Sequence, residues 1–399
     1  MVDVVAFALS ASNFKPHTIT SRYNSEVKKL TVFICIPWFH PAFRAGGPVQ
    51  SIANMVNELA GIDFRIYCSN TDLNNTTLEN IEINKWVHYN DHTMVWYAGP
   101  DKRSDSVLKQ LAFIKPDILY IVGIFSWHFN MVPLIFSKVS QKIISVRGML
   151  HPGALSQKSG KKKIFLSLWK LFNLHKKTSF HATDFAEEKH IREVFGEKVS
   201  ITVAGNFPRK FLPQTTINKD KGSLRLVSIA LISPMKNHLL VLQALEKCTG
   251  MIEYHICGPV KDMQYWQECL LQIKNLPVNI TVQYHGDVQP QMVEGYLHDC
   301  DVFILPSKSE NFGHAIYEAL TAGKPVITSN HTPWRELKKN RAGLNVDTDI
   351  AAIKDAIEFF TTMDAPEYNV WKMRAAQYAT DAFDLDETKE QYRRLFRKQ

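Results

Sequence analysis

The sequence predicts an α/β protein of two doubly wound domains that face each other across a cleft. Short apolar runs, typical of strands buried on both faces of a parallel sheet, alternate with amphipathic segments in both halves of the chain. A polar, proline-marked stretch at residues 206–223 separates the halves. The length of 399 residues, 45% of them hydrophobic, suffices for two ordinary cores. We therefore expect domains at 29–205 and 224–365, joined by a linker at 206–223.

The first domain should begin after a loose extension, because residues 1–28 fit no element of the pattern. Residues 30–37 read as its first strand, and residues 50–59 have apolar side chains at helical spacing. Gly46 and Gly47 lie between the two. A glycine pair at this place allows close approach to a phosphate group, although it does not form Gly-x-Gly-x-x-Gly, and a plain tight turn is the alternative.

Two further segments of this domain follow strand-like runs and should end at the same edge of the sheet, facing the cleft. The first carries His128, and the second carries Arg147 and His151 in Arg147-Gly148-Met149-Leu150-His151. These three side chains are candidates for acceptor binding or acid–base assistance. For each histidine, an ordinary hydrogen-bonded loop residue is an equally good interpretation.

A strongly basic window occupies residues 141–180, which contain nine Lys or Arg and no Asp or Glu, in a chain of net charge +8. Within it, residues 161–172 mix lysines with aromatic and aliphatic side chains in a predicted helix. Through residues 158–177 we expect attraction to anionic headgroups or to a lipid-diphosphate acceptor. The main alternative is a solvated basic face on a core helix. We expect no nucleic-acid partner, because no binding motif of that class is present.

The second domain opens with a strand at residues 226–230, a loop ending in Met235-Lys236-Asn237, and an amphipathic segment up to Leu245. A further strand ends at Cys257-Gly258-Pro259, where Gly258 permits a turn. Lys236 is a candidate anion ligand, with a surface lysine at a helix start as the alternative.

The most informative stretch follows the apolar strand 302–305 and runs from Glu310 to Glu318. A helix starting near Gly313 would open at the carboxyl edge of the sheet, where its free N–H groups and positive dipole end can hold an anion. Eight helical positions span roughly 12 Å, which exceeds the 5–9.5 Å between the two carboxylates of a glycosidase. The two glutamates are therefore expected to contact distant parts of one elongated anion.

These motifs resemble the donor site of retaining glycosyltransferases of family 4, which have the GT-B fold. The resemblance rests on Glu310 and Glu318 with Phe312-Gly313 between them, and on Ser233-Pro234-Met235-Lys236. It implies that Glu310 faces the transferred sugar, that Gly313 and His314 hold the diphosphate together with Lys236, and that Glu318 binds the ribose. Further donor contacts implied in this way lie at Gly46, Gly47, Gly258, Asn311 and Phe312. The Arg147-Gly148-Met149-Leu150 segment is similar to one in bacterial members that build surface polysaccharides.

The chain departs from the family pattern at Leu231, where the family usually has an arginine that clamps the diphosphate. The loss removes a charge-assisted phosphate contact, so another cation or a helix N-terminus must compensate, and Arg147 is the candidate. No cofactor or metal is expected. The sequence shows no Asp-x-Asp after an apolar strand of the kind that metal-dependent glycosyltransferases use, and Asp347-Thr348-Asp349 follows a weak strand and looks like a helix cap.

Other features limit the cellular setting. Six cysteines are scattered without a Cys-x-x-Cys pair and are expected to be reduced core residues. No apolar run reaches the length of about 20 residues that crosses a bilayer. The resemblance implies that the final helices, residues 366–399, cross back to the first domain. We expect a cytoplasmic protein, peripheral on the inner face of the cytoplasmic membrane.

The resulting function hypothesis is a glycosyltransferase that moves a hexosyl group from a nucleotide-diphosphate sugar to a glycan or a lipid-linked oligosaccharide precursor. Two alternatives stay open. One is another GT-B enzyme, such as a sugar-nucleotide epimerase or a phosphorylase. The other is a non-catalytic nucleotide-sugar-binding protein, an alternative motivated by Leu231.

Overall fold

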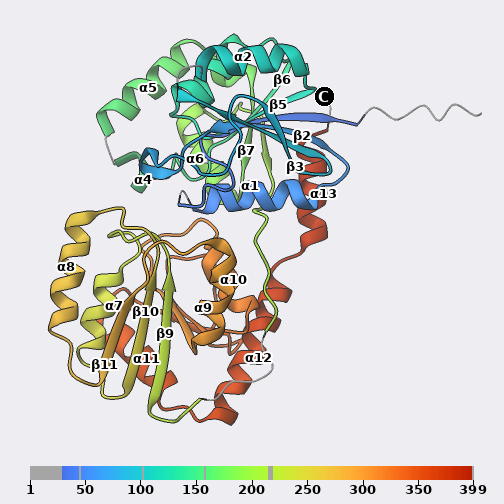
Figure 1. Ribbon diagram of the computed structural model, residues 1–399. Helices are drawn as coiled ribbons and strands as arrows, with labels where there is room; N and C mark the ends of the chain where they lie inside the picture. Colours follow the sequence, from blue (N-terminus) through green and yellow to red (C-terminus); the bar gives the residue numbers. More distant parts are fainter. Residues whose placement is uncertain (1–28, 45, 101–102, 157–158, 214–218, 398–399) are drawn as a thin grey trace, which may run out of the picture.

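The computed structural model describes residues 29–44, 46–100, 103–156, 159–213 and 219–397. The predicted extension at 1–28 and Lys158 lie outside the described residues, and so do parts of the linker. Two α/β domains are stacked one above the other, and the last helices run along one side of both (Figure 1). No helix within the described ranges is long and apolar enough to cross a membrane.

The first domain holds, among the described residues, an eight-stranded sheet of order β3-β4-β2-β1-β5-β6-β7-β8, parallel except for the antiparallel pair β3 and β4. Its strands are β1 Thr31–Cys35, β2 Asp63–Ser69, β3 Trp86–Asn90, β4 Thr93–Ala98, β5 Ile118–Val122, β6 Gln141–Ser145, β7 Ser179–Ala182 and β8 Ile201–Val203. Its α-helices are α1 Gly47–Glu58, α2 Arg103–Ile114, α3 Val132–Phe136, α4 Pro152–Ser156, α5 Ser159–Leu171 and α6 Phe185–Phe195. A π-helix, Trp127–Met131, follows β5, and 3₁₀ turns lie at Leu73–Asn75 and Leu174–Lys177.

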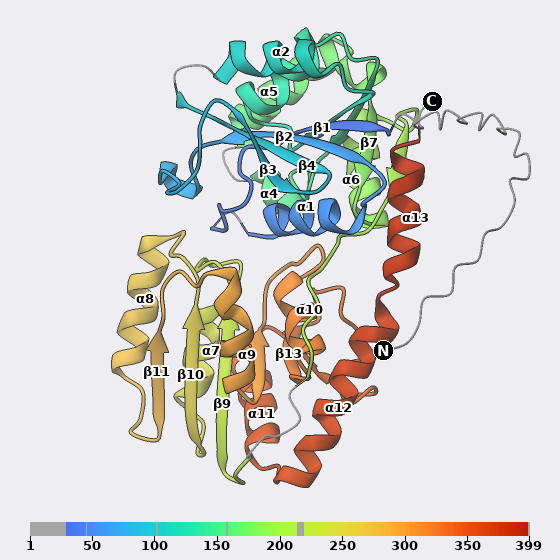
Figure 2. The ribbon, with the colours of Figure 1, turned by 45° about the vertical axis from the view of Figure 1, so that its right-hand side comes forward.

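The second domain has a six-stranded parallel sheet of order β11-β10-β9-β12-β13-β14 within the described chain. Its strands are β9 Ser223–Ile229, β10 Met251–Cys257, β11 Ile280–Tyr284, β12 Val302–Leu305, β13 Val326–Ser329 and β14 Gly343–Val346. Its helices are α7 His238–Leu245, α8 Met263–Lys274, the 3₁₀ turn Pro290–Met292, α9 Val293–Asp299, α10 His314–Thr321 and α11 Ile350–Thr361. The strand order reverses between β9 and β12, and a crevice forms at the carboxyl ends of the strands at such a point. Those ends point toward the first domain (Figure 2).

Two C-terminal helices connect the domains a second time. Helix α12, Ala365–Ala382, packs on α10 through a cluster that includes Ala375 and Ala379. Helix α13, Leu385–Leu395, lies against the first domain (Figure 2), where Tyr392 and Phe396 are buried in the core beside β1. The chain thus crosses back to the first domain.

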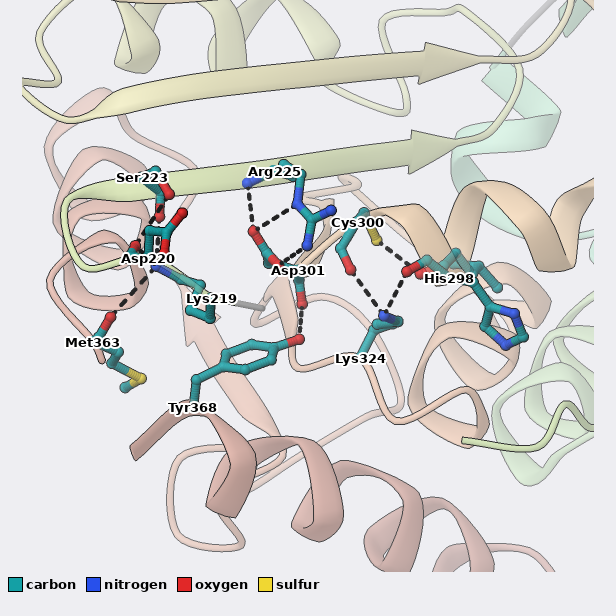
Figure 3. Close-up of polar contacts among 11 residues, drawn as sticks. Lys219, Asp220, Ser223, Arg225, His298, Cys300, Asp301, Lys324, Met363 and Tyr368 are labelled. Carbon is teal, nitrogen blue, oxygen red and sulfur yellow. Dashed lines mark hydrogen bonds and ion pairs between the residues drawn. The ribbon is translucent and has the colours of Figure 1, made fainter. Parts of the chain in front are cut away.

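Buried polar groups hold the amino ends of β9 and β12 in place (Figure 3). The Asp301 carboxylate accepts hydrogen bonds from the backbone N–H of Arg225 at 2.8 Å and from its guanidinium at 2.7 Å. The ammonium of Lys324, a fully buried side chain, donates to the carbonyl of Cys300 at 2.8 Å, and Tyr368 of α12 donates to the carbonyl of Asp301 at 2.6 Å. Because these contacts fix one end of the sheet, the loops at its other end start from a rigid base.

The predicted helix in the basic window is α5, and it is only partly a core helix. Leu166 and Trp169 are buried, whereas Ile164, Leu171 and Phe172 are 65%, 71% and 64% exposed. The placement of the Lys161 side chain lies outside the description. All six cysteines are within the described residues, buried and unpaired, as predicted.

Two buried histidines are neutral in the folded protein. Burial lowers the pKa of His181 to about 3, and the nearby Arg147 charge adds to this effect. Burial likewise lowers the pKa of His238 to about 3, assisted by Lys236. His181 bonds Tyr120 and the carbonyl of Ala204, whereas neither ring nitrogen of His238 has a partner among the described residues.

We expect thermal stability to fall as the pH is lowered from about 6.5 toward 3. In this window the unfolded chain binds one more proton per histidine than the folded protein, so each costs about 1.4 kcal/mol of stability per pH unit. The contribution of the two histidines to the free energy of unfolding has its full value above about pH 6.5. Melting curves at pH 7, 6 and 5 measure the effect. His238→Leu should flatten the pH dependence, whereas His88→Gln, at an exposed site, should not. Equal slopes in all three proteins would contradict the prediction.

Candidate functional site

A cavity of about 390 Å³ lies between the domains at the carboxyl ends of β9 and β12. It is lined by all of the residues predicted for the donor site: Gly46, Gly47, Lys236, Gly258, Glu310, Asn311, Phe312, Gly313, His314 and Glu318. Arg147 also lines this cavity, as does Leu231. His128 and His151 do not. The two candidate motifs of the second domain and the glycine pair of the first domain therefore line the same cavity.

Glu310 is held in a fixed position by two partners. Its Oε1 accepts hydrogen bonds from the Lys236 ammonium at 2.5 Å and from the Ser307 hydroxyl at 2.7 Å. The Lys236 loop is joined to the Glu310 loop at two more points, because Asn237 Nδ2 donates to the carbonyl of Pro306 and the Lys308 N–H to that of Met235. The carboxylate and the ammonium thus form one preorganised pair that faces the cavity.

Helix α10 begins where the sequence predicts an anion site. Its N-cap Gly313 has φ 78°, and a Cβ there would lie 3.1 Å from Ile316 Cδ1, so both conformation and space favour glycine. The N–H groups of Gly313, His314 and Ala315 have no acceptor among the described residues. The helix start therefore offers hydrogen-bond donors and the positive end of the helix dipole to the cavity.

His314 packs between the domains. A Cβ added at Gly47 would lie 3.3 Å from His314 Cδ2, and the imidazole centroid is 4.9 Å from that of Phe312. Burial, assisted by the nearby Arg147 charge, lowers the pKa of His314 to about 3. Its Nδ1 has no partner within the described structure. His314 is therefore neutral, and the absence of a side chain at Gly47 lets the two domains approach here.

Glu318 faces the same cavity from the second turn of α10. It is 6% exposed, and burial raises the pKa of its carboxyl group, against the opposing influence of Arg209. Arg209 Nε lies 3.4 Å from Glu318 Oε1. The sequence placed Arg209 in the linker and gave it no role; its position between two aromatic residues was the only signal.

Arg147 is committed to structural contacts. Its NH1 donates to Ser51 Oγ at 3.1 Å and to Asn206 Oδ1 at 2.5 Å, and its NH2 donates to the hydroxyls of Tyr120 and Tyr392. These partners come from α1, the linker, β5 and α13. The guanidinium therefore ties the first domain to the two segments that lead to the second.

A second cavity, of about 940 Å³, adjoins the first and is lined by His151, Asn311 and Glu310, among others. His151 Nδ1 accepts a hydrogen bond from the N–H of Gly153, and the His151 ring lies 5.1 Å from that of His190. Asn311 Nδ2 donates to Thr183 Oγ1 of the first domain at 2.7 Å, which closes one side of the cleft. His128 lies in the π-helix after β5, away from both cavities.

No group of three or more His, Cys, Asp or Glu in the described ranges is arranged to hold a metal ion. Asp349, in the Asp-x-Asp sequence, is the N-cap of α11 and accepts a hydrogen bond from the N–H of Ala352 at 2.9 Å. This is the helix cap that the sequence predicted.

Part of the chain matches the model of a known protein family. Residues 214–378 match the model of the family glycosyl transferases group 1. The match covers the second domain, the last part of the linker and most of α12, and it contains Lys236, Gly258, Glu310 and Glu318.

Two curated relatives are glycosyltransferases. The chain is 31% identical over 91 residues to 2-deoxystreptamine N-acetyl-D-glucosaminyltransferase from Niallia circulans, which is 23% of either chain. It is 27% identical over 150 residues to the amylovoran biosynthesis glycosyltransferase AmsK from Erwinia amylovora, 35% of this chain and 36% of the relative. The chain thus spans only about a quarter to a third of the length of these relatives.

Solved structures share the whole architecture. Sucrose-phosphate synthase from Thermosynechococcus elongatus has a TM-score of 0.68 at 16% identity, covering 92% of this chain and 99% of that one. Anabaena HepE in complex with UDP and glucose has a TM-score of 0.64 at 16% identity, with the same coverage. The lipopolysaccharide glycosyltransferase WaaG has a TM-score of 0.61 at 12% identity, again with 92% and 99% coverage. At these identities the likeness concerns the fold, and the predicted GT-B architecture is confirmed.

Proposed function

We propose that this protein is a retaining glycosyltransferase, similar to family 4, that moves a hexosyl group from a nucleotide-diphosphate sugar to a glycan or lipid-linked oligosaccharide precursor. The observation that carries the proposal is that Glu310, Lys236, the start of α10 and Glu318 line one cavity between two doubly wound domains. An elongated ligand with a central diphosphate fits this order of groups. The family match and the UDP and glucose in the HepE structure support a nucleotide-sugar donor.

In the proposed reaction the chain acts mainly by positioning the donor and by stabilising its leaving group. The N–H groups of Gly313 and His314 and the Lys236 ammonium would hold the diphosphate, on which negative charge grows as the sugar bond breaks. Glu310 would orient the sugar, and Glu318 the ribose. Because Lys236 and Glu310 bind each other in the described structure, donor binding must exchange part of this pair for phosphate and sugar contacts.

The acceptor would enter through the second cavity, where its hydroxyl group can approach the sugar from the side of Asn311. His151 and His190 line this cavity and can exchange hydrogen bonds with sugar hydroxyl groups. A surface-polysaccharide precursor, of the lipopolysaccharide or capsule type, is the proposed acceptor class, and the amylovoran relative supports it.

A donor screen tests the proposal. Purified protein is incubated with UDP-, GDP-, ADP-, CDP- and dTDP-hexoses, and released nucleoside diphosphate is measured. Turnover of one donor is expected, and NMR of the product should show the anomeric configuration of that donor. Nucleotide binding without any turnover, with acceptor extracts present, would favour a binding protein. An inverted product would contradict the retaining mechanism.

The same proposal places the protein at the cytoplasmic face of a membrane, through α5 and the segment after it. Ile164, Leu171 and Phe172 are exposed beside the exposed lysines 163, 170 and 176. Each lysine near an anionic surface raises the binding constant for that surface roughly fivefold. Replacing these three lysines with Gln should therefore weaken vesicle binding about a hundredfold. Co-sedimentation with phosphatidylglycerol vesicles measures this.

A matched control removes the same charge from the other domain, through Lys247→Gln, Lys274→Gln and Lys338→Gln, all at exposed positions. This variant should bind vesicles like the wild type. If both variants lose binding equally, net charge alone accounts for the attraction, and a solvated basic face becomes the better interpretation of α5.

A further inference from the structure

The donor cavity contains four cationic side chains, and three of them are occupied by other groups. Lys236 binds Glu310, and the NH1 and NH2 groups of Arg147 bind four partners within the first domain and its connections. Arg44 pairs with Asp287 and donates from NH1 to Thr76 Oγ1 at 2.9 Å. The fourth cation, Arg209, also has protein partners, Glu318 and the carbonyl of Pro290, but its NH2 has none among the described residues. Arg209 is therefore the candidate to replace the guanidinium that the resemblance to family 4 leads us to expect at position 231.

The linker holds Arg209 in place between two buried aromatic anchors. Phe207 is fully buried in the core of the first domain and lies 4.9 Å from the ring of Tyr392. Phe211 is buried in a core cluster of the second domain, and its N–H donates to Thr321 Oγ1 at 3.1 Å. Only a few residues separate the anchors, so the backbone at Arg209 cannot move far from the cavity while the domains keep this arrangement.

The Arg209 guanidinium is positioned but keeps hydrogen-bonding capacity. Its NH1 donates to the carbonyl of Pro290 at 2.8 Å, and its Cζ lies 4.4 Å above the Phe211 ring. Its Nε is near Glu318 but makes no hydrogen bond, and NH2 has no partner among the described residues. A planar guanidinium has five N–H donors, so NH2 can still donate to a phosphate oxygen while the buried Nε faces Glu318.

Charge balance in the cavity is consistent with this role. Glu318 is buried on α10, about one turn beyond the free N–H groups of Gly313 and His314. Arg209 opposes the effect of burial on this carboxyl group and favours its charged form. A cation at this place would lie between the ribose and the phosphates of a ligand that spans from Glu318 to the start of α10.

We infer that Arg209 is the second cation of the nucleotide-diphosphate site and takes the place of the arginine absent at Leu231. The inference rests on the proposed function and deepens it. A residue of the linker thereby contacts the donor, so the position of the linker and occupancy of the site depend on each other.

Calorimetry on the full chain tests the inference by measuring the affinity for UDP. If UDP does not bind, GDP, ADP, CDP and dTDP are used in its place. A charged hydrogen bond to phosphate is worth about ten- to a hundredfold in affinity, so Arg209→Gln should weaken binding of the nucleoside diphosphate by about that factor. Binding of the bare nucleoside, followed by ligand-observed NMR, should change less than about threefold. Introducing arginine by Leu231→Arg in the Arg209→Gln protein should restore most of the lost affinity.

Lys210→Gln is the matched control, because Lys210 is the exposed neighbour of Arg209 and its loss changes net charge equally. It should bind like the wild type, and melting curves should verify that all variants fold. Arg209→Lys keeps the charge and should bind better than Arg209→Gln. Wild-type affinity for the nucleoside diphosphate in Arg209→Gln would overturn the inference and leave the proposed function standing. Equal losses of affinity for the nucleoside and for the nucleoside diphosphate would also overturn it, because they would indicate that Arg209 acts only through Glu318. Failure of the wild type to bind any of the five nucleotides would overturn the proposed function as well.

Discussion

Replacing Glu310 with glutamine is expected to lower sugar transfer at least about 100-fold and to leave nucleoside diphosphate affinity unchanged or slightly higher. The substitution keeps the shape of the side chain but removes the charge that faces the sugar. It also frees Lys236, whose ammonium is bonded to Glu310 at 2.5 Å, so a phosphate gains a partner that is no longer shared. Initial rates of nucleotide release and calorimetry with the bare nucleotide measure the two effects separately.

The control for this variant is Glu193→Gln on the exposed face of α6, which should transfer sugar like the wild type. A Glu310→Gln protein with wild-type turnover would remove Glu310 from the reaction and with it the proposed arrangement of the donor. A protein that loses nucleotide affinity in parallel with turnover would instead indicate that Glu310 only shapes the cavity.

Replacing Gly258 with alanine is expected to destabilise the second domain by about 3 kcal/mol or more. Gly258 directly follows β10 and has φ 134°, and a Cβ at this position would lie 2.1 Å from the backbone oxygen of Ala230, in the loop after β9. The clash is with backbone, so no side-chain rotation relieves it. Gly258 and Ala230 both line the donor cavity, so nucleotide affinity should fall together with stability. Urea denaturation and calorimetry measure these changes.

Gly295→Ala provides the comparison, because Gly295 lies within α9 and an added Cβ would meet nothing within 4 Å. Alanine in the middle of a helix should stabilise the domain by roughly 0.5–1 kcal/mol. Equal stability of the Gly258→Ala and Gly295→Ala proteins would mean that the backbone after β10 relaxes freely. The expected requirement for glycine at position 258 would then be wrong.

The elements of the donor site were predictable because their signals are local. An apolar run of four residues, Val302 to Leu305, forms β12 with the predicted bounds, and a glycine followed by an amphipathic segment forms the start of α10 at His314. Parallel strands bring their carboxyl ends to one edge, so the loops carrying Lys236, Gly258 and Glu310 had to meet once the strands were recognised. Short-range patterns of apolar, glycine and polar residues therefore sufficed for the fold class and for the meeting of these loops, whereas the donor contacts expected of individual residues came from the resemblance to family 4.

The contacts between the domains had no such signal. Asn311 meets Thr183 across 128 positions of the chain, and Arg147 meets Tyr392 across 245. The sequence made Arg147 the substitute for the charge missing at Leu231, but the structure occupies both of its terminal nitrogens with hydrogen bonds inside the protein. Arg209 reaches the cavity because Phe207 and Phe211 are buried in different cores. Periodicity and motif spacing report on neighbours along one element, whereas the partner of a buried cation depends on how separate domains pack, and that packing exists only in the folded chain.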